Sequence, residues 1–272
     1  MNAMRIKDLL QDRRLPRLEA RMLVEQVWRR PRAWLLAHDD EPADAGLAAA
    51  YEALAQRRLA GEPMAYVIGE REFMGHVFRV TPAVLIPRPD TETLVEAALD
   101  YLRARPRARV LDLGTGSGAI AVSIALACPQ AQVTATDLSA EALAVARGNA
   151  QALGARVAFA QGSWFEAIGD DCGFDLIVSN PPYIHAADGH LAEGDLRFEP
   201  RSALTDGADG LGALAEIARQ APGRLLPGGA LWMEHGWDQA PAVRALLQQA
   251  GLREVASRRD LAGIERISGG FL

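Results

Sequence analysis

The sequence predicts an α/β fold with a mostly parallel sheet behind a small helical domain. Three observations predict it. After Arg109 the chain alternates strand-like and helix-like segments, a glycine-rich turn at 114–118 joins the first such strand to the first helix, and the residues before 62 show only helical spacing. Regular alternation is typical of parallel sheets with helices on both faces, in which ligands bind at the carboxyl ends of the strands.

The composition is that of a soluble globular protein. The 272 residues are 49% hydrophobic and 24% charged, enough to bury a full core without disulfides or metals. The longest nearly apolar run, 119–128, is about half of the roughly 20 residues that a membrane span needs. Charges occupy the N-terminus where a signal peptide needs an apolar stretch, so we expect a cytoplasmic protein. Cys128 and Cys172 are too few for a zinc cluster or a disulfide framework, and no metal site is expected.

Residues 4–61 are expected to form several helices, because apolar side chains recur at helical spacing. Pro16 and Pro31 lie where helices can begin, since a proline in the first turn loses no hydrogen bond. The pattern then changes to short β-type runs at 66–68 and 77–80, which predict a hairpin. After the hairpin, a proline-rich connector leads to a helix that Asp90 or Thr91 can cap. The expected organisation is a helical bundle at 1–64, a hairpin and linker at 65–88, and the main domain at 89–272.

The main domain contains the segments that define the sheet. We expect strands at 110–113, 133–136, 157–160, 175–179 and 230–234, two more near Val255 and Ile267, and helices at 119–127, 141–153, 211–221 and 243–250. The carboxyl ends of these strands are therefore the places to look for chemistry.

The glycine-rich turn is the first of three such places. It consists of Gly114, Thr115, Gly116, Ser117 and Gly118. Glycines let a ligand lie against peptide groups that a Cβ would push away. The turn satisfies the dinucleotide fingerprint, and Asp137 ends the next strand, where a carboxylate binds ribose hydroxyls in both nicotinamide and S-adenosylmethionine sites. Asp112, just ahead of the turn, would repel a pyrophosphate but tolerates the positive charges of S-adenosylmethionine.

The second place is Trp164, which follows the third strand of the main domain. A tryptophan at a strand's carboxyl end can stack on an adenine ring, although an isolated tryptophan is more often part of a core. Trp164 is therefore a candidate cofactor residue beside the glycine-rich turn.

The third place is the run Asn180-Pro181-Pro182-Tyr183, after the fourth strand. Two prolines fix φ and remove two amide donors, so the loop is rigid and cannot join the sheet. Asn180 offers a side-chain carbonyl and Tyr183 a flat ring, an arrangement that suits a planar NH2 group. If the Asn180 side chain and the Pro181 carbonyl each accept one N–H, the third direction of the nitrogen points at an electrophile. No strong general base is needed, because the nitrogen becomes acidic after methyl transfer.

Together these motifs resemble class I S-adenosylmethionine-dependent methyltransferases that act on planar nitrogens. Other segments resemble the bacterial release factor glutamine methyltransferases: Gly61-Glu62-Pro63, Glu72-Phe73, Leu85 to Glu92, and Asp260-Leu261-Ala262-Gly263 with Arg266. The resemblance covers nearly the whole chain. It implies a Rossmann-like fold with a seven-stranded, mostly parallel sheet, a small N-terminal helical domain and a β-hairpin linker.

The resemblance also implies a reaction, methylation of the glutamine amide nitrogen (N5) in the Gly-Gly-Gln motif of class I peptide chain release factors. S-adenosyl-L-methionine is the implied cofactor and S-adenosyl-L-homocysteine its product. The implied cofactor-binding residues are Asp112, the turn Gly114–Gly118, Asp137, Trp164 and Asn180, and the implied catalytic residues are Asn180, Pro181, Pro182 and Tyr183. The helical domain would grip the release factor, and residues 87–92 would lie by the site as a lid or wall. Ser163 departs from the family, which often has an acid there.

Three alternatives remain at this stage. The same Asn-Pro-Pro-Tyr run occurs in N6-adenine methyltransferases that act on nucleic acid, but the net charge is −6 and no basic recognition domain is evident. The glycine-rich turn alone also fits a nicotinamide dehydrogenase. A release factor or ribosome chaperone with a vestigial pocket would not be an enzyme at all. We expect a monomer that binds neither nucleic acid nor membranes directly.

Overall fold

The computed structural model describes residues 4–170 and 173–272, so Cys172 lies outside the described residues. The chain divides into two compact units, Met1–Glu70 and Arg71–Leu272. Residues 65–70, which the sequence analysis assigned to a linker, therefore belong with the helical unit, and residues 71–88 belong with the sheet. Among the described residues, none of the helices has both the length and the apolar character that crossing a bilayer requires.

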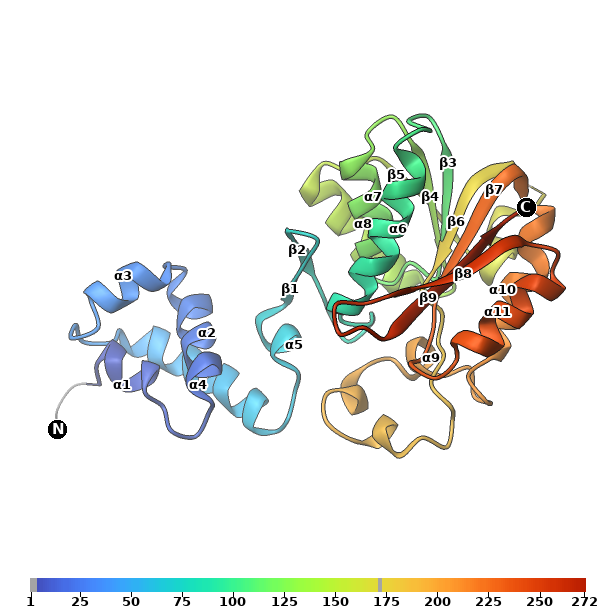
Figure 1. Cartoon of the computed structure of the whole chain (residues 1–272). Coiled ribbons are helices and arrows are strands. Elements are labelled where there is room, and N and C mark those ends of the chain that lie inside the picture. The colour runs from blue at the N-terminus through green and yellow to red at the C-terminus, as the bar shows by residue number, and fades with distance from the viewer. Residues whose placement is uncertain (1–3, 171–172) are drawn as a thin grey trace. The chain divides into compact units, whose positions relative to one another are not determined.

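The first unit is a bundle of short helices (Figure 1). They are α1 (Ile6–Leu10), α2 (Arg17–Trp28), α3 (Arg32–Ala37), α4 (Ala45–Leu59) and α5 (Met64–Ile68). As predicted, α2 and α3 begin directly after Pro16 and Pro31. Their apolar faces enclose a small core around Leu23, Leu35 and Tyr51, each of them at most 1% exposed.

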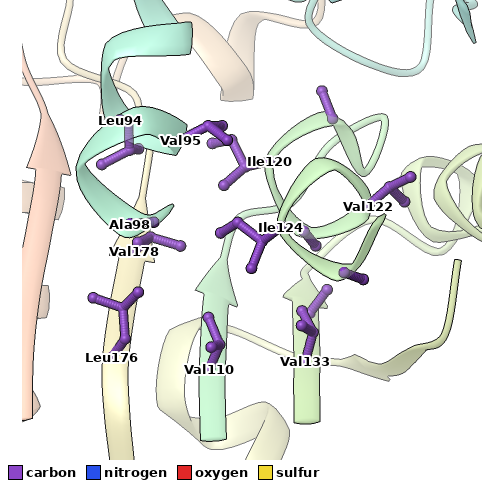
Figure 2. Close-up of a cluster of buried hydrophobic side chains, with 14 of the residues drawn as sticks. Leu94, Val95, Ala98, Val110, Ile120, Val122, Ile124, Val133, Leu176 and Val178 are labelled. Atoms are coloured by element: carbon purple, nitrogen blue, oxygen red, sulfur yellow. The ribbon is translucent and has the colours of Figure 1, made fainter. Parts of the chain in front are cut away.

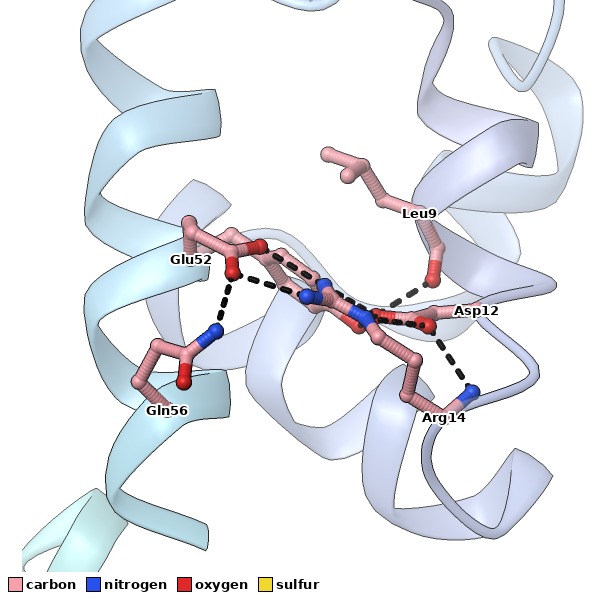
Figure 3. A network of polar contacts seen from close by, with 6 residues as sticks. Leu9, Asp12, Arg14, Glu52 and Gln56 are labelled. Atoms are coloured by element: carbon pink, nitrogen blue, oxygen red, sulfur yellow. Dashed lines mark hydrogen bonds and ion pairs between the residues drawn. The ribbon is translucent and has the colours of Figure 1, made fainter. Parts of the chain in front are cut away.

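A polar network ties the loop after α1 to α4 (Figure 3). The Arg14 guanidinium binds the carboxylates of both Asp12 and Glu52, and the Tyr51 hydroxyl donates to Asp12 Oδ2 over 3.0 Å. The hydrogen bond from Arg14 lowers the pKa of Asp12 to about 2. Because the Arg14 side chain is 44% exposed, these ion pairs fix the geometry of the loop more than they add to stability.

The hairpin is present but begins later than predicted. The expected strand at 66–68 is wrong: these residues form helix α5, which starts after Pro63 and ends at Gly69 with φ of +80°. A run of three apolar residues fits a strand and a buried helix turn equally well, so its flanking residues decide. The hairpin pairs β1 (Glu70–Phe73) with β2 (His76–Arg79).

The second unit is built on a seven-stranded sheet with the order β5-β4-β3-β6-β7-β9-β8. The strands are β3 (Arg109–Leu113), β4 (Gln132–Asp137), β5 (Val157–Gln161), β6 (Phe174–Ser179), β7 (Leu225–Glu234), β8 (Arg253–Arg259) and β9 (Glu265–Phe271). The pairs from β5 to β7 are parallel, whereas β9 runs antiparallel to both of its neighbours. All seven strands predicted for the main domain are present.

Helices cover both faces of this sheet (Figure 1). The α-helices are α6 (Glu92–Leu102), α7 (Ala119–Ala127), α8 (Ala140–Leu153), α9 (Arg201–Leu204), α10 (Gly212–Gln220) and α11 (Ala240–Gln249). Short 3₁₀ helices are η1 (Pro89–Thr91), η2 (Trp164–Ile168), η3 (Gly189–Ala192), η4 (Leu196–Phe198) and η5 (Ala221–Gly223). For the central strands, this two-layer cover leaves the strand ends as the places that a ligand can reach.

The strands contribute to two separate cores because alternate side chains point to opposite faces. Val110 packs with the α6 and α7 side, and its neighbour Leu111 packs with the α10 and α11 side. Figure 2 shows the first core, in which Ile120 and Ile124 of α7 lie above the strands. Both faces of the central strands are therefore dry.

The start of α6 differs from the prediction. Neither Asp90 nor Thr91 caps this helix, which is entered from the 3₁₀ turn η1. Asp90 instead pairs with Arg266, and the Thr91 hydroxyl accepts a hydrogen bond from Asn180. These side chains have tertiary partners that no local pattern reveals.

We predict that Ile124→Ala destabilises the second unit by about 2–5 kcal/mol, because it opens a cavity in a fully buried core. Ile264→Ala, the same change at a side chain that is 37% exposed, should cost no more than about 0.5 kcal/mol. Urea unfolding of both variants measures the difference. Equal losses would contradict the assignment of Ile124 to the core.

Candidate active site

The candidate site lies at the carboxyl ends of β3 and β6. The chain moves outward from β3 to β4 and β5, then returns to place β6 on the other side of β3. Loops that leave β3 and β6 therefore diverge, and such a switch point is where open α/β sheets bind ligands. A cavity of about 290 Å³ opens there, lined by residues from the glycine-rich turn, from Asp137, from Trp164 and from the Asn180 loop.

Asp137 holds the glycine-rich turn in place. Its Oδ2 accepts the amide of Gly116 over 2.8 Å, and its Oδ1 accepts the amide of Ser139 over 2.9 Å. The carboxylate keeps further lone pairs, and Asp137 lines the cavity. Of the turn, Gly114, Thr115, Gly116 and Ser117 line the cavity with it.

Two predicted cofactor residues do not line the cavity. Asp112 is fully buried, and its Oδ2 accepts a 2.6 Å hydrogen bond from the Thr115 hydroxyl, while its Oδ1 finds no partner among the described residues. Burial raises the pKa of Asp112 to about 7. Gly118 has a φ of +83°, and a Cβ there would come within 3.1 Å of Ala146 Cβ. Gly118 thus allows α7 and α8 to pack closely.

Trp164 lies against the glycine-rich turn. Its ring lines the cavity, and a Cβ on Gly114 would come within 3.3 Å of it. The backbone of Trp164 has φ of +43°, an uncommon conformation for a residue with a side chain. Trp164 therefore forms one wall of the cavity and also packs against the α10 and α11 core.

The Asn-Pro-Pro-Tyr loop contributes three of its four residues to the cavity. Asn180, Pro181 and Pro182 line it, whereas Tyr183 does not. The Tyr183 ring packs against the α10 and α11 core, and its hydroxyl donates to Glu234 Oε1 over 3.0 Å. The sequence analysis expects this ring to cover the substrate, but in the structure the ring does not line the cavity. A phenol at this depth needs a hydrogen-bond acceptor, and Glu234 supplies one.

The Asn180 side chain has a defined orientation. Its Nδ2 donates to Thr91 Oγ1 over 3.2 Å, and its Oδ1 accepts no hydrogen bond from the described residues. The free atom at the cavity is therefore an acceptor, as the sequence analysis required.

The connector that precedes α6 forms the opposite wall. Pro87, Arg88 and Thr91 line the cavity, which agrees with the lid or wall expected from 87–92. Glu199, whose side chain is buried, accepts the Ile86 amide over 3.0 Å and pairs with the Arg88 guanidinium.

Sequence reasoning missed two buried acids, Glu199 and Glu234. For Glu199 the sequence carried no local signal. Glu234 ends a predicted strand at the same edge as Asn180, and that position could have revealed it. The described residues contain no group of three or more His, Cys, Asp or Glu side chains arranged to hold a metal ion.

Comparison with known proteins identifies the family. Residues 4–69 match the model of the PrmC N-terminal domain, and residues 90–195 match the methyltransferase small domain. The release factor glutamine methyltransferase of Bordetella pertussis is 72% identical over 98% of this chain and 99% of its own length. The chain belongs to the release factor glutamine methyltransferase family. The Burkholderia pseudomallei member is 53% identical over 97% of this chain and 95% of its own length.

Solved structures agree with the fold. A methyltransferase from Pyrococcus furiosus superposes with a TM-score of 0.54 at 20% identity, covering 80% of this chain and 96% of that one. This likeness supports the Rossmann-like methyltransferase fold of the family member described here. The predicted fold class is confirmed, and the dehydrogenase and nucleic-acid methyltransferase alternatives are not favoured.

We predict that Asp112→Asn changes how stability depends on pH. Between pH 4 and 7 the unfolded Asp112 ionises while the buried one stays protonated, because burial raises its pKa from 3.8 to about 7. The free energy of unfolding of the wild type should therefore fall across this range relative to that of the variant. Urea unfolding at several pH values measures this, with Asp238→Asn at an exposed site as control. Parallel curves for wild type and Asp112→Asn would contradict the burial argument.

Proposed function

We propose that this chain methylates the glutamine side-chain amide nitrogen in the Gly-Gly-Gln motif of class I peptide chain release factors, with S-adenosyl-L-methionine as donor and S-adenosyl-L-homocysteine as product. The single observation that carries the proposal is the orientation of Asn180, whose amide group is turned so that an acceptor oxygen is free at the cavity. The names of the full-length relatives support the choice of substrate.

The residues present fit S-adenosylmethionine, which supplies an electrophilic methyl group on a sulfonium. Asp137 stands where a carboxylate binds ribose hydroxyls, and Trp164 offers a ring for adenine. Gly116 has no atom within 4 Å of the place a Cβ would occupy, so the space beside this residue is open to a ligand.

The Asn180 loop fits the glutamine amide. The Asn180 Oδ1 and the Pro181 carbonyl would each accept one N–H of the NH2 group, and the rigid prolines keep the two oxygens in place. Holding both hydrogens stabilises the pyramidal nitrogen of the transition state, whose lone pair is otherwise delocalised into the amide carbonyl. The nitrogen would gain the methyl group as the bond between the methyl carbon and the sulfonium sulfur breaks, and it would then release one proton to solvent.

The helical unit is proposed to bind the release factor away from the glutamine. We further propose that the enzyme works as a monomer in the cytoplasm and does not contact nucleic acid directly. The acidic net charge of −6 supports this last point, because phosphate binding relies on clustered basic residues.

A direct assay tests the function. The protein is incubated with methyl-labelled S-adenosylmethionine and an unmodified release factor, and the label is mapped by mass spectrometry. We expect it on the glutamine of Gly-Gly-Gln, and a release factor with that glutamine changed to alanine is the control. Label on added DNA or RNA, with none on the release factor, would support the N6-adenine alternative instead.

We predict that Asn180→Ala lowers kcat by about 100-fold or more, because it removes a group that orients the acceptor nitrogen. The dissociation constant of S-adenosylmethionine should change much less. Single-turnover assays and calorimetry measure the two quantities. A large loss of cofactor affinity with little change in kcat would show that Asn180 serves the cofactor instead.

Asp137→Ala should have the opposite profile. We expect the dissociation constant of S-adenosylmethionine to rise by about 10-fold or more, since a charge-assisted hydrogen bond to a ribose hydroxyl is worth about 1.5–3 kcal/mol. Calorimetric titration measures it, and Asp209→Ala at an exposed site is the control. An unchanged dissociation constant would remove the ribose assignment.

A further inference from the structure

Two hydrogen bonds to buried residues hold the ends of the Asn-Pro-Pro-Tyr loop. At one end Asn180 Nδ2 donates to Thr91 Oγ1, and at the other the Tyr183 hydroxyl donates to Glu234 Oε1. Thr91 is 4% exposed and Glu234 1% exposed. Each end of the loop is therefore hydrogen-bonded to a side chain that the reaction does not consume.

Thr91 and Glu234 are themselves neighbours. Burial raises the pKa of Glu234 to about 7, and the Thr91 hydroxyl partly offsets this by stabilising the ionised carboxylate. Glu234 Oε2 is buried without a direct hydrogen-bond partner among the described residues.

The direction of the contact between Thr91 and Asn180 decides how Asn180 lies. A hydroxyl has one proton and two lone pairs, and in this contact a lone pair of the Thr91 hydroxyl accepts the Asn180 Nδ2–H over 3.2 Å. Lone pairs attract the NH2 end of the Asn180 amide and repel its carbonyl end. The two ends have nearly the same shape, so packing alone cannot choose between them.

We propose that Thr91 is a positioning residue for methyl transfer, whose hydroxyl selects the orientation of the Asn180 amide that presents Oδ1 to the acceptor nitrogen. The inference rests on the proposed function, because it concerns the same reaction. In the reversed orientation Asn180 would present N–H groups to the N–H groups of the glutamine amide, and neither side would be satisfied.

The segment around Thr91 is fixed at several points, as a positioning role requires. Arg88 pairs with the buried Glu199 before it, and Asp90 pairs with Arg266 of β9 over 3.3 Å. After it, Glu92 Oε1 accepts the amide of Met74 over 2.8 Å. These contacts explain why charged residues alternate with prolines in the stretch that carries the family resemblance. They place one hydroxyl beside Asn180.

Two variants separate the hydroxyl from the shape of the side chain. Thr91→Val keeps the shape and removes the hydroxyl, whereas Thr91→Ser keeps the hydroxyl and removes a methyl group. We expect Thr91→Val to lower kcat on the release factor by about 10- to 100-fold. Thr91→Ser should stay within about threefold of the wild type, and KM for the release factor should remain within about threefold in both.

Three results would overturn the inference. The first is a kcat for Thr91→Val close to that of the wild type. The second is an equal loss in both variants, which would indicate packing. The third is a raised dissociation constant for S-adenosylmethionine in Thr91→Val, which would assign Thr91 to cofactor binding. Calorimetry with the cofactor and thermal unfolding are measured on all three proteins. The wild type tests the proposed function separately, because its failure to methylate the release factor would contradict that function whatever the variants do.

Discussion

The parallel pairing of β3 with β6 is the constraint on which the site depends. Its register sets Leu113 beside Ser179, and the Ser179 hydroxyl donates to the Leu113 carbonyl over 2.8 Å. The next residue on each strand begins a functional loop, Gly114 on one and Asn180 on the other. A shift of one residue would separate the two loops and turn every core side chain of the strand to the opposite face. The donor side and the acceptor side of the reaction therefore meet because two strands pair in one register.

Buried carboxyl groups surround this meeting point, and burial raises the pKa of each. Asp112, Glu199 and Glu234 show the effect, and for Asp112 and Glu234 the pKa rises to about 7. Burying an acid costs folding free energy unless partners satisfy it. The partners of Asp112 and Glu199 are Thr115 and Arg88, which line the cavity. The partner of Glu234 is Tyr183, the last residue of the Asn-Pro-Pro-Tyr loop. The site thus exchanges some stability for loops that are already in position before ligands bind.

Local patterns predicted the sheet and most of the site. The strands of the main domain alternate with amphipathic or buried helices at spacings that exclude other folds, so their number and order of appearance could be read directly. The motif residues Gly116, Asp137 and Asn180 were placed correctly at one edge because parallel strands share that edge. The helix at 66–68 was missed, since three apolar residues carry too little periodicity to separate helix from strand.

By itself the sequence determined which segments form strands and which loops carry glycine, proline and asparagine, because propensity and periodicity act over a few neighbouring residues. Only the tertiary structure decided the partners of polar side chains that are distant in the chain. Thr91 and Asn180 are 89 residues apart, and Arg88 and Glu199 are 111 apart. Likewise Tyr183 turns away from the cavity because Glu234, 51 residues later, accepts its hydroxyl. Hydrogen bonds of buried groups are satisfied by whatever folding brings near, and no local pattern encodes that.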